Sequence, residues 1–247
     1  MMSNWLMLTL FLAIVFLAHM LEGITGFGST ALSIPFLSVL LGVEIAKPLL
    51  MLYTLFLSIY ILIRAYRDID WKSLAVILGM AALGLPIGLL LYNRLPREIL
   101  MITLGIFMVI ISIRGLLFTF GIVKENGEPK NWLLLLALFC GGMIQGAFGS
   151  GGPLFILYTT QKIKEKSRFR ATMCLVWLVL NSVLLIQMQL ANQLSPEMWR
   201  FSLYGAPALI AGALLGNYAH KKVSDAAFTK LIYSVLLVSG MFVFFNL

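Results

Sequence analysis

Two short stretches of small and hydroxyl residues carry most of the chemistry that this sequence offers. The tripeptide Phe-Gly-Ser occurs at residues 27–29 and again at residues 148–150, each time inside a long apolar run. Glycine allows backbone angles that point several N–H groups the same way, and Ser and Thr are typical of helix starts. Because a helix start offers unpaired N–H groups and the positive end of a dipole, each stretch predicts a place that attracts a small anion.

We call residues 23–30 the first break and residues 146–153 the second break. Non-helical backbone persists inside a membrane only where it is packed in protein or lines a wet cavity. Two interpretations are open: buried Gly-rich turns, or two helix starts that meet near the midplane and hold one anion. The second interpretation predicts these substrate-binding residues: Gly26, Phe27, Gly28, Ser29, Thr30, Gln145, Phe148, Gly149, Ser150, Gly151 and Gly152.

Four polar residues within apolar segments are further candidates for coupling or for pairing with an anion: His19, Glu22, Arg114 and Asn181. Ionisable groups are costly in a membrane and usually face a cavity. His19 and Glu22 lie three residues apart on one helix face, where they either relay protons or mark a helix end. Arg114 can pair with the anion, reach the interface or neutralise Glu22, and the amide of Asn181 can bind substrate or join helices.

The composition places these residues in a membrane protein. Of the 247 residues, 61% are hydrophobic and 11% are charged, whereas soluble domains have about 25% charged residues. The net charge of +8 comes from short loops between apolar segments, which indicates membrane topology rather than nucleic-acid binding. The expected partners are a small anionic substrate and the lipid bilayer. The pattern predicts no catalytic residues, metal ligands or cofactor, and it indicates no oligomeric state.

Pro, Gly and charged clusters divide the chain into apolar segments, which predicts an all-α polytopic membrane protein. We expect segments at residues 4–20, 30–41, 48–63, 73–92, 98–120, 132–145, 153–160, 171–190, 201–220 and 226–245. The second, sixth and seventh are shorter than the roughly 20 residues that span a bilayer. We therefore expect broken or re-entrant helices at the Gly-rich motifs.

The two halves of the chain are similar to each other. The tripeptides are 121 residues apart, whereas Trp71 and Trp199 are 128 residues apart, as are the glycine pairs 84/88 and 212/216. This spacing predicts seven extra residues in the second half, which we place in the basic loop at residues 162–170.

We predict a first membrane repeat at residues 1–123, a cytoplasmic linker at residues 124–131 and a second repeat at residues 132–247. Each half holds five segments, an odd number, so the second repeat is expected to enter the membrane from the opposite side. Twelve loop Lys and Arg residues lie on one face and four on the other, which predicts that both termini lie outside the cytoplasm.

The glycine-rich breaks, the Pro35 that follows the first, the matched halves and the length together resemble the sulfite exporter TauE/SafE family of membrane permeases. The resemblance covers essentially the whole chain. It implies a bacterial inner-membrane permease for sulfite, sulfonates such as sulfoacetate, or related small sulfur-containing anions. We therefore expect a secondary transporter that exports or exchanges such an anion by alternating access around a midplane site.

Two other functions stay open. An anion channel would use the same helix dipoles without alternating access. An intramembrane serine hydrolase would use Ser150, but its nucleophile needs a base within hydrogen-bond reach, and the chain has just two histidines, His19 and His220. Because the sequence has no Gly-x-x-x-x-Gly-Lys-Ser/Thr motif, we expect ion or substrate gradients to supply the energy. We predict a transporter, not an enzyme.

Overall fold

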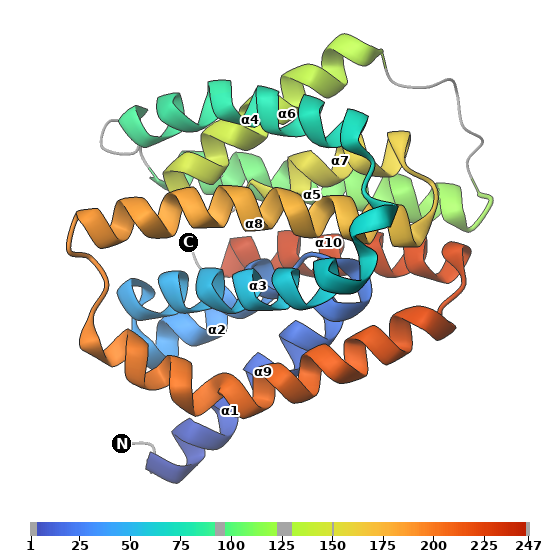
Figure 1. The fold of residues 1–247 in the computed structure, drawn as a ribbon. Helices are drawn as coiled ribbons and strands as arrows, with labels where there is room; N and C mark the ends of the chain where they lie inside the picture. Colours follow the sequence, from blue (N-terminus) through green and yellow to red (C-terminus); the bar gives the residue numbers. More distant parts are fainter. Residues whose placement is uncertain (1–3, 92–96, 123–129, 150, 246–247) are drawn as a thin grey trace. The chain divides into compact units, whose positions relative to one another are not determined.

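The computed structural model describes residues 4–91, 97–122, 130–149 and 151–245. Ser150 and nearly all of the linker predicted at residues 124–131 lie outside these ranges. Within them, all regular structure is helical (Figure 1). The α-helices are α1 (Asn4–Thr25), α2 (Ser29–Leu41), α3 (Val43–Ala65), α4 (Trp71–Leu91), α5 (Arg97–Thr119), α6 (Asn131–Phe148), α7 (Gly152–Lys162), α8 (Lys166–Leu190), α9 (Pro196–Lys222) and α10 (Asp225–Phe245), with one 3-10 turn, η1 (Tyr66–Asp68).

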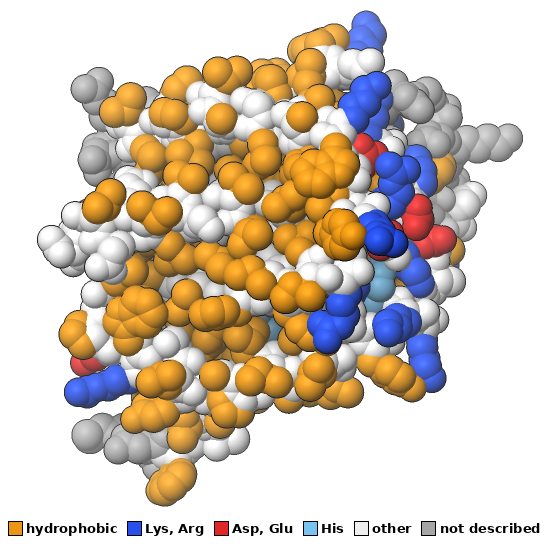
Figure 2. Space-filling view, viewed as in Figure 1, with side chains coloured by type: hydrophobic (Ala, Val, Ile, Leu, Met, Phe, Trp, Pro, Cys, Tyr) orange, Lys and Arg blue, Asp and Glu red, His pale blue; other side chains and the backbone are white. Residues whose placement is uncertain are grey.

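Five of the described helices are long and apolar enough to cross a membrane by length and composition: α1, α3, α4, α8 and α9. Large apolar side chains point outward along them, such as Leu90 on α4, 75% exposed, and Leu203 on α9, 74% exposed. Figure 2 shows hydrophobic side chains over most of the visible surface, with Lys and Arg gathered near helix ends. This surface suits lipid rather than water, and the expected all-α polytopic membrane fold is confirmed.

The helices on the C-terminal side of the two breaks are short, as expected. α2 has 13 residues and α7 has 11. At a rise of about 1.5 Å per residue they reach roughly 20 Å and 16 Å, less than the roughly 30 Å of a bilayer core. The sixth segment differs from the expectation, because α6 has 18 residues and continues up to the second break.

The chain forms two compact units, each built from helices of both predicted repeats. Unit 1 contains Met1–Arg67 and Met173–Lys222, and unit 2 contains Asp68–Thr172 and Val223–Leu247. The chain passes between the units three times, once inside α8. The units thus cut across the sequence halves, and the repeat boundaries stay a prediction.

In unit 2, α4 packs against α6 through glycines that bring the two backbones together. A Cβ atom at Gly84 would overlap the carbonyl oxygen of Phe139 and would lie 2.8 Å from the backbone nitrogen of Met143. A Cβ atom at Gly88 would overlap the carbonyl oxygen of Met143. Small residues allow this close approach in membrane helices, and any larger side chain here would separate the pair.

In unit 1, α9 packs against α1 in the same way. A Cβ atom at Gly212 would lie 2.6 Å from the carbonyl oxygen of Phe16 and 3.1 Å from the backbone nitrogen of Met20. A Cβ atom at Gly216 would overlap the carbonyl oxygen of Met20 and would lie 2.9 Å from the Cα atom of Gly23. Each glycine of α9 therefore contacts α1 as its counterpart on α4 contacts α6.

These matching contacts fix the register of the two halves. Phe139 and Met143 follow Phe16 and Met20 by 123 residues, and α2 and α7 begin 123 residues apart. The equivalence of the two Phe-Gly-Ser tripeptides, 121 residues apart, is therefore wrong by two residues. Phe27 lies between two helices, whereas Phe148 is the last residue of α6.

The corrected register also moves the extra residues of the second half. α3 begins at Val43 and α8 at Lys166, again 123 residues apart, while the glycines of α4 and α9 are 128 residues apart. The second half has thus gained five residues, not seven, and it has gained them after the start of α8. The basic loop at residues 162–170 is therefore the wrong place for them. Its residues from 166 onward form the first turn of α8.

Candidate functional site

The first break contains a turn of three residues, 26–28, between α1 and α2. α1 ends at Thr25 and α2 begins at Ser29. Gly26 and Gly28 have φ angles of 81° and 101°, in the left-handed region that favours glycine. Two left-handed glycines within three residues stop one helix and start the next, so this local sequence makes a sharp interruption rather than a kink.

Side-chain donors satisfy the carbonyl groups at the end of α1. The Nδ1 atom of His220 donates to the oxygen of Ile24 at 2.7 Å, and the Nε1 atom of Trp177 donates to the oxygen of Gly26 at 3.0 Å. The hydroxyl of Thr25 lies 2.8 Å from the oxygen of Phe27 and 2.8 Å from that of Leu21. The negative end of α1 is thereby capped by donors from α8, α9 and its own last turn.

The amide side of the first break has no such cap. Gly28 stands at the N-cap position of α2 and has no side chain that could accept a hydrogen bond from the first-turn amides. The first amides of a helix have no acceptor within the helix. With its carbonyls bonded and its helix start uncapped, the first break presents the positive end of α2.

A chain of hydrogen bonds connects the start of α2 to a buried carboxyl group. The Oγ1 atom of Thr54 donates to the Oε2 atom of Glu22 at 3.3 Å, and the Oγ atom of Ser29 lies 3.2 Å from the same Thr54 hydroxyl. Glu22 is 3% exposed, Thr54 2% and Ser29 0%. Thr54 is the middle residue of α3, so the chain lies at the mid-height of a membrane-length helix.

His19 lies one turn before Glu22 and is fully buried. Its Nδ1 atom is 2.7 Å from the carbonyl oxygen of Val15, and a carbonyl only accepts, so Nδ1 carries the hydrogen in the neutral ring. The Nε2 atom has no hydrogen-bond partner among the described residues. The ring packs edge-on against Tyr53, with the ring centroids 5.4 Å apart.

At the second break, in unit 2, a side chain accepts a hydrogen bond from a backbone amide just before the next helix. Gly149 ends α6 in the left-handed conformation with a φ angle of 68°. The buried Gln145 accepts a hydrogen bond from the backbone nitrogen of Gly151 through Oε1 at 2.9 Å. Gly152 begins α7 and Pro153 follows it, as is typical of a first helical turn.

Glu22 and Gln145 occupy equivalent places in the two halves. They are 123 residues apart, which is the register given by the helix packing, and each lies in the last turn before its break. One half therefore carries a carboxyl group and the other a neutral amide. The sequence showed both residues beside the breaks, but the alignment through the tripeptides hid their equivalence.

Two further candidates lie on α8 and α5. Asn181 is a buried residue of α8, in unit 1, and is 4% exposed. Arg114 is exposed on α5, in unit 2, whereas Glu22 belongs to unit 1. Unit 1 brings together Glu22 and the first break, and unit 2 holds the second break. Three important partners have no signal in the sequence, because they come from distant helices: Thr54, Trp177 and His220.

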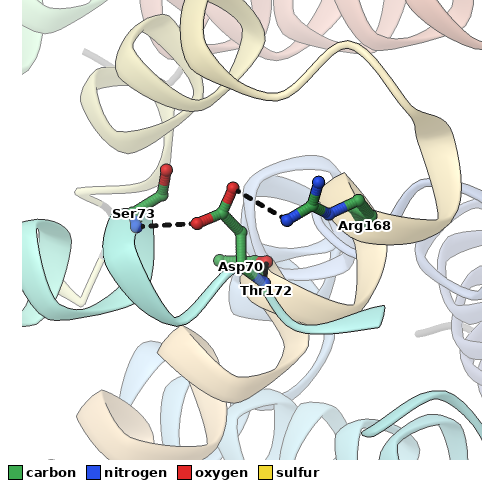
Figure 3. A network of polar contacts seen from close by, with 4 residues as sticks. All are labelled: Asp70, Ser73, Arg168 and Thr172. Carbon is green, nitrogen blue, oxygen red and sulfur yellow. Dashed lines mark hydrogen bonds and ion pairs between the residues drawn. The ribbon is translucent and has the colours of Figure 1, made fainter. Parts of the chain in front are cut away.

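A polar network in unit 2 fixes the starts of α4 and α8 (Figure 3). The Oδ1 atom of Asp70 accepts a hydrogen bond from the backbone nitrogen of Ser73 at 3.0 Å, which caps α4. Its Oδ2 atom lies 3.4 Å from the Nη2 atom of Arg168, and its backbone nitrogen donates to the hydroxyl of Thr172 at 2.9 Å. The Asp-x-x-Ser spacing before an apolar run was the available sequence signal for this cap.

Comparisons with known proteins agree with this fold. A probable inner membrane transporter protein, TsaS of Comamonas testosteroni, is 24% identical over 180 residues, which cover 71% of this chain and 73% of that protein. No solved structure matches the chain significantly. The family described as sulfite exporter TauE/SafE matches residues 11–243. Because this match spans nearly the whole sequence, the chain belongs to the sulfite exporter TauE/SafE family and is a multi-pass membrane transporter.

Proposed function

We propose that this protein is a secondary transporter that exports or exchanges a small sulfur-containing anion, such as sulfite or a sulfonate, across the inner membrane by alternating access. One observation carries the proposal. At the first break the carbonyl groups of Ile24, Gly26 and Phe27 are bonded to side-chain donors, while the start of α2 lacks a side-chain cap.

This asymmetry favours an anion over a cation. A coordinated cation would compete for the carbonyl oxygens of Ile24, Gly26 and Phe27 with the donors that already bond them, which are His220, Trp177 and Thr25. An anion needs N–H and O–H donors, which the first turn of α2 and the hydroxyls of Ser29 and Thr30 supply. The first break thus has the chemistry of an oxyanion site without a buried Lys or Arg.

We propose that the second break contributes to the same substrate. The residues assigned there are Gln145, Phe148, Gly149, Ser150, Gly151 and Gly152. Their share is weaker, because the amide of Gly151 is already bonded to Gln145. The first break would then provide most of the donors.

The family description and the loop charges support the rest of the proposal. The matched family is described as a sulfite exporter, which suits a small tetrahedral or pyramidal oxyanion. We place the protein in the inner membrane with both termini outside the cytoplasm, because the basic loops gather on one face. Fusing a reporter that fluoresces only in the cytoplasm to Leu247 tests this orientation, since fluorescence there would contradict it.

Transport by purified protein in proteoliposomes tests the function. The probes are labelled sulfite, thiosulfate and methanesulfonate, each compared with protein-free vesicles. We expect saturable uptake of at least one probe, faster when the vesicles contain the same anion, because exchange is typical of a carrier. Absence of uptake for all three would contradict the proposal, and single-channel currents would show a channel instead.

Two glycine variants locate the site in the same assay. Gly28→Ala strains a residue with a φ angle of 101° at the start of α2 and should lower the apparent affinity. Gly121→Ala is the matched control, because Gly121 also has a positive φ angle, 73°, and has nothing within 4 Å of its added Cβ atom. If both variants lowered the apparent affinity equally, backbone strain and not the binding site would explain the loss of affinity.

A further inference from the structure

We propose that Glu22, Thr54 and Ser29 form a switch that couples the binding of one proton to the binding of the transported anion. The inference rests on the proposed function, because it assumes that the anion binds at the start of α2. It adds a second ligand, the proton, and a binding group for it. It also gives the direction of the coupling.

The geometry restricts the arrangement of hydroxyl hydrogens when Glu22 is ionised. A carboxylate only accepts, so the Thr54 hydroxyl must donate its single hydrogen to the Oε2 atom of Glu22, 3.3 Å away. The Oγ atom of Ser29 lies 3.2 Å from Thr54 and also bonds the Glu22 carboxyl group, so its single hydrogen goes to Thr54 or directly to the carboxylate. In this state Ser29 presents lone pairs, and no hydrogen, to an anion at the start of α2.

Protonation of Glu22 reverses the chain. The new carboxyl hydrogen is donated to the oxygen of Thr54, Thr54 turns its own hydrogen toward Ser29, and the hydrogen of Ser29 is released for the anion. One proton enters at Glu22 and no other proton is gained or lost, since the two hydroxyls only rotate. Proton binding thus removes a negative charge near the anion and adds a donor to its site, so both effects strengthen anion binding.

The surroundings of Glu22 favour a change of its charge, because no cation among the residues that the structure describes holds it ionised. The described residues include no ion pair to Glu22, and a buried carboxylate without one is costly. Titratable side chains in this part of unit 1 include His19 on α1, Tyr53 on α3 and His220 on α9. Each is engaged elsewhere: the two histidines bond backbone carbonyls, and the Tyr53 hydroxyl donates to the carbonyls of residues 201 and 202.

The other helices packed around Glu22 add no charge. α2 contains no ionisable residue, and the part of α8 that belongs to unit 1 contains no Asp, Glu, His, Lys, Arg or Tyr; its one titratable group is the thiol of the buried Cys174. The charged residues of α3 and α9 lie toward the ends of those helices, at Glu44, Lys47, Arg64, Glu197, Arg200, Lys221 and Lys222. The Nε2 atom of His19, which has no partner among the described residues, lies one turn before Glu22 along α1 and can accept a proton on the way to the carboxyl group.

The second break shows why the switch belongs to one half only. The equivalent residue, Gln145, cannot take up a proton, and its Oε1 atom is fixed to the backbone of Gly151. A single exchangeable proton per transport cycle follows. Because coupling between two ligands is reciprocal, the anion must also strengthen proton binding. Anion and proton therefore move together, in the direction set by their combined gradients.

Anion accumulation against a pH gradient tests this switch in proteoliposomes, with the membrane potential clamped at zero. The probes are again sulfite, thiosulfate and methanesulfonate, and a pH dye inside the vesicles reports proton entry. With one proton per anion, a gradient of about one pH unit should concentrate the anion about tenfold. Glu22→Gln should equilibrate the anion without accumulating it or moving protons.

Thr54→Val provides a second variant that leaves the carboxyl group in place. It removes one of the two hydroxyls that bond Glu22, the one that also bonds Ser29, so accumulation should fall while uptake down a gradient persists. Ser58→Ala is the matched control, because Ser58 is buried one turn away on α3 and lies outside the chain. It should accumulate the anion as the unmodified protein does.

Each outcome separates the switch from the transport function. Equilibration of an anion by the unmodified protein without accumulation would overturn the switch and leave the proposed function intact. Unchanged accumulation in both Glu22→Gln and Thr54→Val would also overturn it. Failure of the unmodified protein to move any probe would contradict the proposed function itself. If Glu22→Gln does not fold, as judged by thermal unfolding in detergent, Thr54→Val decides the question.

Discussion

Trp177 and Gly26 are 151 residues apart in the chain, yet the indole nitrogen of Trp177 lies 3.0 Å from the carbonyl oxygen of Gly26. A carbonyl released from a helix inside a membrane needs a donor, because the hydrocarbon offers none. The hydrogen bond from Trp177 on α8 therefore offsets the free-energy cost of interrupting the helix after α1. The indole stabilises a turn that Gly26 alone would only permit.

Replacing this donor should destabilise the protein. Trp177→Phe keeps a large aromatic ring but leaves the buried oxygen of Gly26 unsatisfied, which costs about 1–3 kcal/mol. Thermal unfolding of the purified protein in detergent measures the loss. Trp71→Phe is the control, because Trp71 is 63% exposed at the start of α4. Similar unfolding temperatures for both variants would contradict a structural role for the Trp177 hydrogen bond.

The close contact between α4 and α6 depends on two α4 positions, Gly84 and Gly88, that have no side chain. Gly88→Ala places a methyl group on the carbonyl oxygen of Met143 and should cost about 1–3 kcal/mol through forced separation of the helices. Gly79→Ala, on the same helix, has nothing within 4 Å of its added Cβ atom and should raise stability by up to about 1 kcal/mol. The prediction fails if the two substitutions shift unfolding in the same direction.

The second break should depend on the amide of Gln145. Gln145→Leu preserves size but removes the acceptor for the backbone nitrogen of Gly151, so a buried N–H group loses its partner at a cost of about 1–3 kcal/mol. Gln189→Leu on α8 is a matched change at an exposed position. We expect a lower unfolding temperature and slower anion uptake for the first variant alone. An unchanged unfolding temperature and uptake rate in Gln145→Leu would show that the second break keeps its conformation without this side chain.

Asp70 should matter more as a helix cap than as an ion pair. Asp70→Ala removes the acceptor for the backbone nitrogen of Ser73 and should cost about 1 kcal/mol. Arg168→Ala removes the partner of a pair that is separated by 3.4 Å and whose Arg side chain is 48% exposed, so its cost should stay below about 1 kcal/mol. Unfolding at low and high salt measures both. An equal, salt-sensitive loss in Arg168→Ala would identify the ion pair as the main contribution.

The sequence predicted most helices well because their causes are local. Apolar runs and Gly-rich interruptions located α2 and α7 within two residues at each end. α3 begins earlier than expected because Pro48, which marked the expected start, lies one turn inside the helix. α8 also begins early, since the basic residues from Lys166 onward are helical and not part of a loop.

The candidate site was only partly predictable, for a different reason. The glycines and hydroxyls of the first break are adjacent in sequence, so their chemistry could be recognised there. The groups that complete it, Thr54, Trp177 and His220, come from three other helices, and no spacing rule connects them. The alignment of the two halves was wrong by two residues because it matched the identical Phe-Gly-Ser tripeptides. The equivalent positions are those with equivalent backbone contacts, such as the carbonyl oxygens of Phe16 and Phe139.

The shortness of α2 has a consequence for the biosynthesis of this protein. A 13-residue helix is too short to enter the bilayer by itself as a spanning segment. Gly42 is the single residue between α2 and α3, so the two helices form a hairpin that must leave the translocon together. Until α3 has emerged from the ribosome, the hydroxyl of Ser29 has no Thr54 to bond. The proposed oxyanion site would therefore be assembled only after the third helix is made.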